Sequence, residues 1–327
     1  MAKVTARIVA QEAGVSMAAV TRAFQPGSSL SDDKRRRVLQ VAAKLGYKTP
    51  SGRTLGRIAT GTISLVAGDL SNPFYPAVLE ELSQRLHERG RKLVLHAIPP
   101  GGSIDLVMQQ VIDYRADAAI VTSATMSSRL ASECRRQNLP VVLFNRVQPD
   151  ARMTAVTCDN YGGGRMVAEY LLARGRSRIG YVTGLRNTST HLERARGFLD
   201  VLQENGVTPE CTASGEFSYV RAKDAVRPLL DAASPPDALF CENDVMALAA
   251  IDSARELGIR VPEDLAIIGF DDIPQADWAA YRLTTVRQPV RRMVGETLEL
   301  IELSLSGEAV DGTIRILPVS LIERNSG

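Results

Sequence analysis

Residues 17–22 begin with small and flexible side chains and end with one basic side chain. Their spacing places the basic side chain on the same face of a helix as a small one. Arg22 follows Ala18 by four residues, so the two lie on the same side of a helix that would begin near Met17. A guanidinium can donate two hydrogen bonds to guanine O6 and N7, whereas Met17 and Ala18 can make only apolar contacts, for example with a thymine methyl group. This chemistry suits the reading of base edges in the major groove of DNA.

Other polar side chains in the same part of the chain suit hydrogen bonds to phosphate, which position a protein on DNA without reading its sequence. They are Thr5, Ser16, Thr21, Gln25 and Ser31. A three-helix bundle that binds another protein is the alternative. The distribution of charge favours DNA. Residues 1–62 hold 11 Lys and Arg against 3 Asp and Glu, a net charge of +8, while the remaining 28 basic and 34 acidic residues give −6.

Three short helices are expected to carry these side chains. Thr5 can cap a helix from about Ala6 to Ala13, and Gly14 can end it in the left-handed conformation. Ser16 can cap a second helix that runs to about Phe24. A third helix opens at Ser31 and Asp32, with apolar residues at helical spacing up to Gly46. Two helices joined by a tight glycine-containing turn, followed by a third, predict a helix-turn-helix.

The rest of the chain alternates short β-rich runs with amphipathic helices, in two series. The expected strands of the first series are residues 62–66, 92–98, 118–123 and 141–144, and those of the second are 178–184, 238–241 and 265–270. Such alternation predicts two doubly wound parallel sheets. Loops at the carboxyl ends of their strands would face each other across a cleft, where folds of this kind bind ligands.

Catalytic and metal-binding patterns are not found in the sequence. It has no G-x-x-x-x-G-K-[ST] loop, and Gly162–Arg165 lacks the third glycine of a dinucleotide fingerprint. The four cysteines are scattered and the three histidines lie far apart, so neither a zinc site nor a disulfide framework is expected. We therefore expect a protein that is not an enzyme and needs no cofactor.

The first residues lack an apolar signal core, and no apolar run approaches the roughly 18 residues of a membrane span, which favours the cytoplasm.

Eight motifs in order make the chain similar to the LacI/GalR family of bacterial transcription regulators over essentially its whole length. The head resembles T-x-x-x-V-A-x-x-A-G-V-S-x-x-x-V-[ST]-R, and seven further motifs follow: DLSNPFY (69–75), VVLFNR (141–146), CDN (158–160), ERARGF (193–198), CEND (241–244), VPEDLAIIGFDD (261–272) and LTTVRQP (283–289). The resemblance implies a homodimer whose two heads bind a pseudo-palindromic operator in double-stranded DNA. It also implies a small-molecule effector in the cleft that alters operator affinity.

The resemblance assigns a set of effector-binding residues to the cleft. They are Asp69, Phe74, Asn145, Thr190, Arg194, Asn243, Asp271 and Gln288. Their acid and amide groups suit a neutral sugar, while Arg194 and Arg146 would also accept a sugar acid. Both classes of effector stay open, as does whether the effector releases or strengthens DNA binding.

The linker after the head departs from the family pattern. Family members commonly have a Pro-Asn pair and an Ala-Arg-x-Leu segment, where this chain has KTPSGRTLGR with Gly52 and Gly56. By alignment with that segment, Leu55 would enter the minor groove as an apolar wedge and Arg53 would contact phosphate. Glycine costs about 1 kcal/mol of helix stability relative to alanine, so this hinge is expected to fold less readily on DNA than in most relatives.

The sequence thus predicts a ligand-responsive transcriptional repressor with an α-helical head and an α/β body. The predicted divisions are a DNA-binding domain at 1–47, a hinge linker at 48–61 and an effector-binding and dimerisation domain at 62–327, with a first subdomain of about 62–160 and 290–307 and a second of about 161–289 and 308–327. A secreted solute-binding protein is the rival, but it would carry a signal peptide and no basic head. An enzyme on a similar body would need a nucleotide or nucleophile motif.

Overall fold

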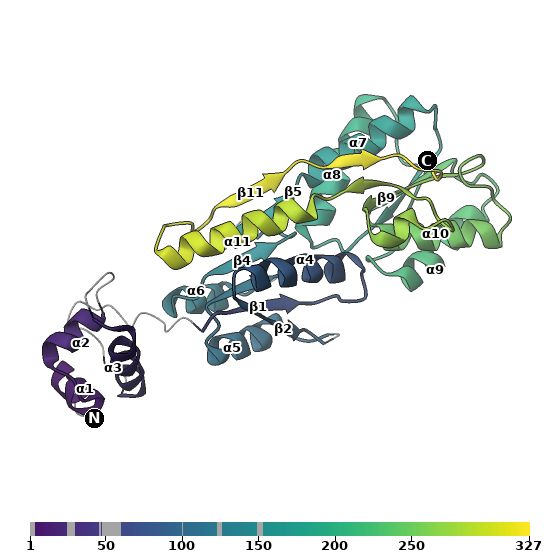
Figure 1. The fold of residues 1–327 in the computed structure, drawn as a ribbon. Coiled ribbons are helices and arrows are strands. Elements are labelled where there is room, and N and C mark those ends of the chain that lie inside the picture. Colours follow the sequence, from purple (N-terminus) through teal and green to yellow (C-terminus); the bar gives the residue numbers. More distant parts are fainter. Residues whose placement is uncertain are drawn as a thin grey trace. The chain divides into compact units, whose positions relative to one another are not determined.

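A computed structural model describes residues 4–24, 30–45, 47, 60–99, 101–122, 126–148 and 153–327. The chain divides into two compact units, Met1–Thr60 and Gly61–Gly327 (Figure 1). We call the first unit the head and the second the body, and each is described by itself. In the described part of the chain, no helix combines the length and the apolar character needed to span a membrane.

The head consists of three helices, as predicted: α1 (Ala6–Ala13), α2 (Met17–Ala23) and α3 (Asp32–Leu45). Gly14 ends α1 in the left-handed conformation with φ 63°, which glycine adopts without steric cost. Ser16 caps α2, since its Oγ accepts a hydrogen bond from the Ala19 amide at 3.2 Å. Thr5 occupies the N-cap position of α1, but the predicted side-chain cap is wrong, because its hydroxyl accepts no capping bond.

A small apolar core holds these helices together. Val9 and Ala13 of α1 pack with Val20 of α2 and with Val38 and Ala42 of α3, and all five are buried. Arg35 of α3 also donates a hydrogen bond to the backbone oxygen of Ala23 at 3.1 Å, which ties the third helix to the end of the second. The outer faces of α1 and α2 are consequently held in a fixed relation.

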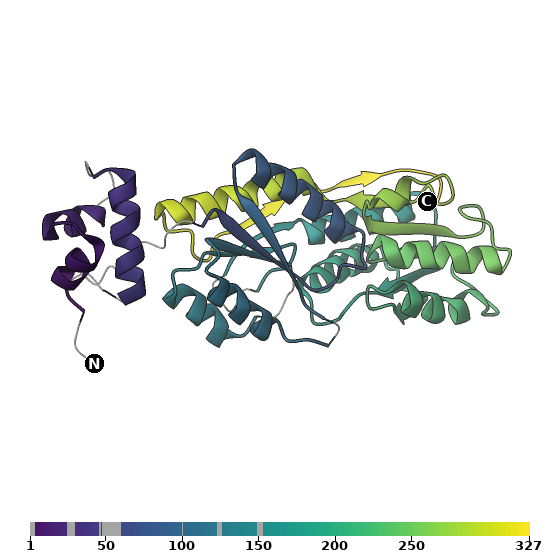
Figure 2. The ribbon, with the colours of Figure 1, turned by 60° about the horizontal axis from the view of Figure 1, so that its bottom comes forward.

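The body contains two six-stranded sheets, each with helices packed against it (Figures 1 and 2). The first sheet has the order β11-β5-β4-β3-β1-β2, and we call it, with its helices, the first lobe. Its strands are β1 (Thr62–Ala67), β2 (Lys92–Ala97), β3 (Ala118–Val121), β4 (Val141–Phe144), β5 (Thr154–Cys158) and β11 (Ile314–Leu317). Its helices are α4 (Phe74–Glu88), α5 (Ile104–Tyr114), α6 (Ser128–Arg136) and α11 (Val290–Ser306).

The second sheet has the order β12-β10-β9-β8-β6-β7 and forms the second lobe. Its strands are β6 (Ile179–Thr183), β7 (Cys211–Ser214), β8 (Ala238–Cys241), β9 (Ala266–Asp271), β10 (Thr284–Arg287) and β12 (Ser320–Ile322). Its helices are α7 (Asn160–Ala173), α8 (Ser189–Glu204), α9 (Tyr219–Leu230), α10 (Asp244–Glu256) and the short 3-10 helix Pro274–Asp277. Phe198 and Phe240 lie at its centre, both fully buried, with ring centroids 4.8 Å apart.

The two-lobed parallel architecture agrees with the prediction, and its C-terminal part corrects it. Residues 308–327 were assigned to the second subdomain, but β11 pairs in parallel with β5 in the first sheet. Only β12 joins the second sheet, where it runs antiparallel to β10. The predicted strands did not include β5, β7, β10, β11 or β12, which are short, and β7 and β10 are rich in small or polar residues that give a weak β pattern.

Two glycines allow α7 and α8 to pack closely, and this contact gives a testable prediction. A Cβ atom at Gly197 of α8 would overlap the backbone oxygen of Tyr161, and one at Gly164 of α7 would overlap the backbone oxygen of Arg194. Backbone atoms cannot move aside as a flexible side chain can, so Gly197→Ala should lower the free energy of unfolding by about 1–3 kcal/mol. Urea unfolding followed by the fluorescence of Trp278, the single tryptophan, measures this change.

Gly295→Ala provides the matched control for this substitution. Gly295 also lies within a helix, α11, but the nearest atom to its Cβ position is the end of the Arg85 side chain at 3.1 Å. Alanine there should be neutral or should stabilise the helix by up to about 1 kcal/mol. Equal effects of the two substitutions would contradict a packing role for Gly197.

Candidate functional site: the exposed helix face and the interlobe cleft

The predicted DNA-contacting residues that the structure describes all have exposed side chains. They are Thr5, Ser16, Met17, Ala18, Thr21, Arg22 and Ser31. The other three, Gln25, Arg53 and Leu55, lie outside the described residues, as does most of the predicted hinge. The structure therefore places the predicted base-reading residues on a solvent-facing surface and leaves the hinge prediction untested.

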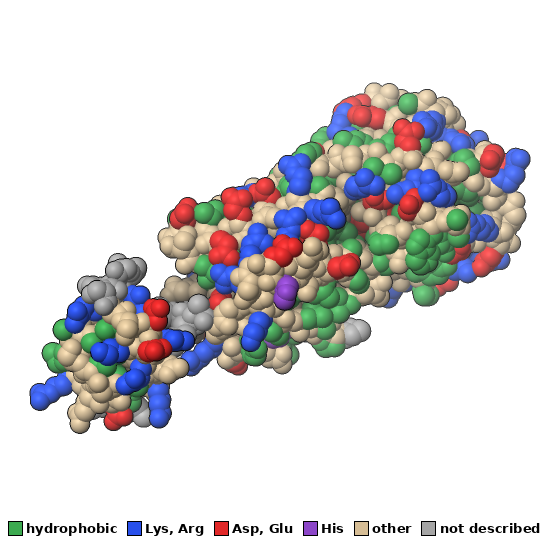
Figure 3. Space-filling model, viewed as in Figure 1, with side chains coloured by type: hydrophobic (Ala, Val, Ile, Leu, Met, Phe, Trp, Pro, Cys, Tyr) green, Lys and Arg blue, Asp and Glu red, His purple; other side chains and the backbone are tan. Residues whose placement is uncertain are grey.

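The exposed face of α2 combines an apolar leading edge with one guanidinium. Met17 is 55% exposed, which is unusual for a large apolar side chain and is consistent with a surface that becomes covered on binding. Arg22 Nε donates to the Ala18 backbone oxygen at 3.3 Å, so its side chain lies back along the helix toward Ala18. Figure 3 shows Lys and Arg side chains at several places on the visible face of the head, as the charge distribution predicts.

In the body, the predicted effector residues follow the carboxyl ends of strands from both sheets. Asp69 follows β1 and Asn145 follows β4 in the first lobe. Asn243 follows β8, Asp271 ends β9 and Gln288 follows β10 in the second lobe. Carboxyl ends of parallel strands collect at one edge of each sheet, and loops from such edges form the ligand sites of doubly wound folds. The topology thus explains why residues far apart in sequence meet.

Seven of the eight predicted effector residues line one cleft. They are Asp69, Phe74, Asn145, Thr190, Arg194, Asn243 and Asp271. Gln288 lies behind the lining, where its Nε2 donates to Asp271 Oδ1 at 2.8 Å. The cleft also contains Asn72, Tyr75 and Phe217, which were not predicted, and Arg146, which the sequence analysis named only as able to accept a sugar acid. Asn72, Tyr75 and Arg146 lie within the quoted motifs, so the motifs could have given them, whereas no sequence pattern pointed to Phe217.

Little free space remains in the cleft in this arrangement of the lobes. The cavity measures about 20 Å³, which is room for about one water molecule. Phe74, Thr190 and Arg194 are each at most 3% exposed. A hydrogen bond also joins the lobes directly, because the Val147 amide donates to Ser189 Oγ at 2.9 Å. A ligand larger than water can enter only if the two lobes separate.

Arg194 is held by three acceptors from the protein. Its Nε donates to Asn160 Oδ1 at 2.9 Å, and Nη2 lies 3.3 Å from Asp271 Oδ1. Nη1 donates to the backbone oxygen of Glu242. The guanidinium carbon lies 3.6 Å from the centroid of the Phe270 ring. Since a guanidinium has five N–H donors, these contacts fix its orientation and still leave donors for a ligand.

The carboxylate of Glu242 fastens the start of α8 to the end of β8. It is fully buried, with Oε2 accepting from the Gly184 amide at 2.7 Å and Oε1 accepting from the Tyr181 hydroxyl. Oε1 also lies 2.7 Å from Nδ1 of His191, next to Thr190. Burial and the neighbouring Glu242 carboxylate raise the pKa of Tyr181 well above its usual range, so the phenol stays protonated and can donate. This contact positions the α8 residues of the cleft.

Unpaired polar atoms and strained backbone mark the same cleft. Asn145 Oδ1, Arg146 Nε and Asn243 Nδ2 are buried and have no hydrogen-bond partner among the described residues. Buried polar groups are nearly always paired, so each of these atoms has an unused capacity to bind a polar ligand. Asn145 and Asp271 also have positive φ angles of 70° and 124°, which non-glycine residues adopt at a cost. Such strain is concentrated at functional sites.

A buried carboxyl group behind the cleft gives a pH-dependent prediction. Burial raises the pKa of Asp244 to about 8, and the nearby Asp271 carboxylate adds to the shift. Because the unfolded chain releases this proton near pH 4, the folded state binds more protons between about pH 4 and 8 and loses stability as the pH rises. Asp244→Asn cannot ionise. The unfolding free energy of the variant minus that of the parent should therefore increase from pH 5 to pH 8, as measured by urea titrations. A difference that does not vary with pH would contradict this assignment.

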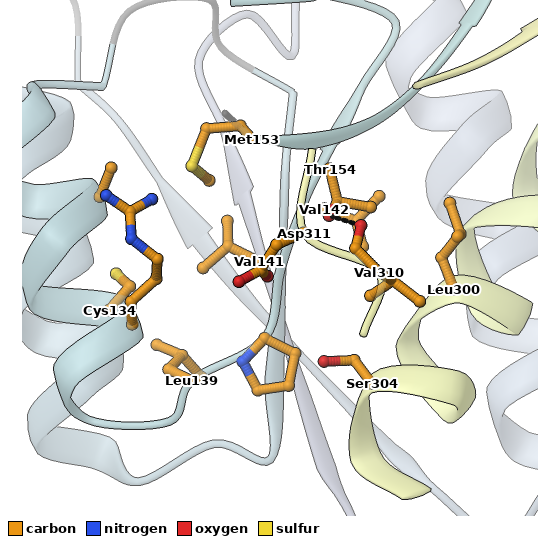
Figure 4. Close-up of a pocket in the computed structure, with 13 residues that line it drawn as sticks. Cys134, Leu139, Val141, Val142, Met153, Thr154, Leu300, Ser304, Val310 and Asp311 are labelled. Atoms are coloured by element: carbon orange, nitrogen blue, oxygen red, sulfur yellow. Dashed lines mark hydrogen bonds between the residues drawn. The ribbon is translucent and has the colours of Figure 1, made fainter. Parts of the chain in front are cut away.

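A second pocket lies at the other end of the first sheet. Figure 4 shows Val141 and Val142 at the start of β4, Thr154 at the start of β5, and Leu300 and Ser304 of α11 around it. Thr154 Oγ1 donates to the Val310 backbone oxygen at 2.8 Å. None of the predicted effector residues borders this pocket. It lies at the amino ends of the strands, away from the edge where doubly wound folds bind ligands.

The described part of the chain holds no group of three or more His, Cys, Asp or Glu residues placed to bind a metal ion. The cleft is lined by hydrogen-bonding side chains and aromatic rings. Carboxylates, amides and guanidiniums together with the rings of Phe74, Tyr75 and Phe217 suit a small polar ligand.

Comparisons with known proteins agree with the two-part architecture. The family profile described as bacterial regulatory proteins, lacI family, matches residues 7–50, and the profile described as periplasmic binding protein-like domain matches residues 168–327. The HTH-type transcriptional repressor CytR of Escherichia coli (strain K12) is 30% identical over 98% of this chain and 96% of its own length. The HTH-type transcriptional regulator DegA of Bacillus subtilis (strain 168) is 32% identical over 99% and 98%.

Among solved structures, a complex of the transcriptional regulator CelR with cellobiose is 29% identical, with a TM-score of 0.73, covering 99% of this chain and 100% of that one. The match therefore extends through the head and both lobes. A regulator profile on the helix-turn-helix and relatives aligned over nearly the full chain leave one conclusion: the chain belongs to the LacI family of bacterial regulatory proteins, whose members are DNA-binding transcription regulators rather than enzymes.

Proposed function

We propose that this protein is a transcriptional repressor whose affinity for its operator is controlled by a sugar or sugar acid bound between the lobes. The observation that carries the proposal is the cleft: polar residues from both lobes converge on it, and three of their buried polar atoms have no partner among the described residues. In a chain with a DNA-binding head, a polar cleft of this kind supports a regulatory ligand rather than a substrate.

In this proposal the head reads DNA through α2. Arg22 contacts guanine, and Met17 and Ala18 make apolar contacts with bases. The residues that contact phosphate are Thr5, Ser16, Thr21, Gln25 and Ser31. One head offers few polar base contacts. The protein therefore acts as a homodimer on a pseudo-palindromic operator in the cytoplasm, with Leu55 as the minor-groove wedge and Arg53 on phosphate.

The effector acts through the relative placement of the lobes. With about 20 Å³ free, the cleft must open to admit a sugar and then close on it. The CelR–cellobiose complex supports a saccharide as the class of ligand. Because the ligand contacts both lobes, it changes the balance between open and closed arrangements and so the balance between operator-competent and incompetent states.

The test begins with an operator selected from random DNA by the purified full-length protein. A thermal-shift screen against neutral sugars and sugar acids then identifies ligands, and fluorescence anisotropy measures operator affinity with and without each one. The proposal expects at least one ligand to raise the melting temperature and change operator affinity by about fivefold or more, the usual range of allosteric coupling. Ligands that stabilise the protein without changing operator affinity would contradict it.

A further inference from the structure

The two guanidinium groups that line the cleft differ in how their charges are balanced. Arg194 and Asp271 form a buried pair, with Nη2 and Oδ1 3.3 Å apart and the side chains 3% and 5% exposed. Each therefore neutralises the other. Arg146 follows Asn145 in the first lobe, and no ion pair or hydrogen bond of its guanidinium exists among the described residues, where its Nε is also buried. Arg146 therefore has no ion-pair partner among the described residues, while the other carboxylate of the cleft, Asp69, is hydrogen-bonded to Ser71.

A second unused donor comes from the opposite lobe. Asn243 is 1% exposed, and its Oδ1 accepts a hydrogen bond from the Met246 amide at 3.0 Å, which caps α10. The cap fixes which way the amide points, so the atom left over is the donor Nδ2. That atom is buried and has no partner in the described part of the chain. Arg146 and Asn243 border the same cavity.

The acceptors of the cleft suit hydroxyl groups rather than a second charge. Asp69 accepts from the Ser71 amide at 3.1 Å and from Ser71 Oγ at 2.6 Å, and it still has lone pairs for a ligand hydroxyl. Asn145 Oδ1 is a further unpaired acceptor. A neutral sugar could satisfy these oxygens, but it would offer Arg146 no ion-pair partner.

We infer that the effector is a sugar acid, a polyhydroxy compound with one carboxylate that Arg146 and Asn243 bind from the two lobes while its hydroxyls meet Asp69 and Asn145. This inference rests on the proposed function and narrows it to one class of ligand. A single unpaired guanidinium matches the single charge of a carboxylate, and an ionised acceptor forms stronger hydrogen bonds than a hydroxyl does. Since the two donors belong to different lobes, the carboxylate also favours closure.

Matched pairs of ligands test the inference with the full-length protein. Isothermal titration compares glucose with glucuronate, galactose with galacturonate, mannose with mannuronate, and sorbitol with gluconate, so that each pair differs only in a carboxylate replacing a hydroxymethyl group. In at least one pair the acid should bind about tenfold to hundredfold more tightly, as a charge-assisted hydrogen bond implies. Arg146→Gln should reduce that preference to about threefold or less, and the exposed Arg129→Gln, with the same charge change outside the cleft, should retain it.

Raising the salt concentration gives a measurement that needs no variant. Salt should weaken binding of the acid much more than binding of its neutral partner, because only the acid depends on a charge pair.

Neutral sugars that bind as tightly as their acids and change operator affinity would overturn this inference while leaving the proposed function intact. A preference that survives Arg146→Gln would overturn the role of Arg146. If no compound of either class binds, both the inference and the proposed class of effector fail.

Discussion

Replacement of Arg22 by alanine is expected to abolish most of the preference for operator over random DNA. A guanidinium that binds guanine O6 and N7 contributes about 1–3 kcal/mol of discrimination, which is about tenfold to hundredfold for each half-site. Binding to random DNA depends on phosphate contacts and should fall much less. Arg22 is exposed on α2 and lies outside the core of the head, so the variant should fold normally.

Titrations of the selected operator and of a random duplex by fluorescence anisotropy measure both affinities. Arg36→Ala is the control for net charge, since Arg36 is exposed on α3 and pairs with Asp33 at 2.7 Å. Arg36→Ala should weaken binding to both duplexes by a similar factor, smaller than the loss of operator binding in Arg22→Ala. Arg22→Lys keeps the charge without the planar fork and should lose specificity as well. Equal losses on both duplexes for Arg22→Ala would rule out base reading by this residue.

Arg194→Ala is expected to remove the effector response and also to destabilise the body. The alanine variant would leave the carboxylate of Asp271 buried without its cation, which costs about 3–5 kcal/mol. It would also remove the guanidinium that stacks on Phe270. Urea unfolding followed by Trp278 fluorescence should show the loss of stability. Titration with an effector found in the screen should show no change in operator affinity.

A double variant separates the two consequences. Arg194→Met with Asp271→Asn removes both buried charges and fills much of the space, so it should recover a large part of the lost stability. It should still fail to respond to the effector, because both proposed ligand contacts are missing. A double variant with normal stability and an unchanged ligand dose curve would contradict the assignment of these two residues to the effector site.

The head was predictable because its structure follows from local interactions. The bounds of α1, α2 and α3 depend on Gly14, on the Ser16 cap and on apolar residues at helical spacing, all of which can be read within a few residues of sequence. Thr5 was the exception, since whether a hydroxyl at the N-cap position accepts the capping bond depends on its rotamer.

The body was predictable in class but not in strand membership. Alternating β-rich and helical runs indicate parallel sheets, yet nothing near Ile314–Leu317 shows which sheet they join. These residues join the first sheet because they pair with β5, which lies more than 150 residues earlier in the chain. Long-range pairing leaves no local pattern, which is why the assignment of residues 308–327 was partly wrong.

The sequence by itself determined the exposed face of the helix-turn-helix and most of the residues of the cleft, because capping, helical spacing and the family motifs are properties of short segments. Only the tertiary structure decided how the cleft residues use their polar atoms. Arg194, which the family motifs assigned to the cleft, is paired with Asp271, while the guanidinium of Arg146 has no ion-pair partner among the described residues. The physical reason is that hydrogen-bond satisfaction and charge balance depend on which side chains the two sheets bring together.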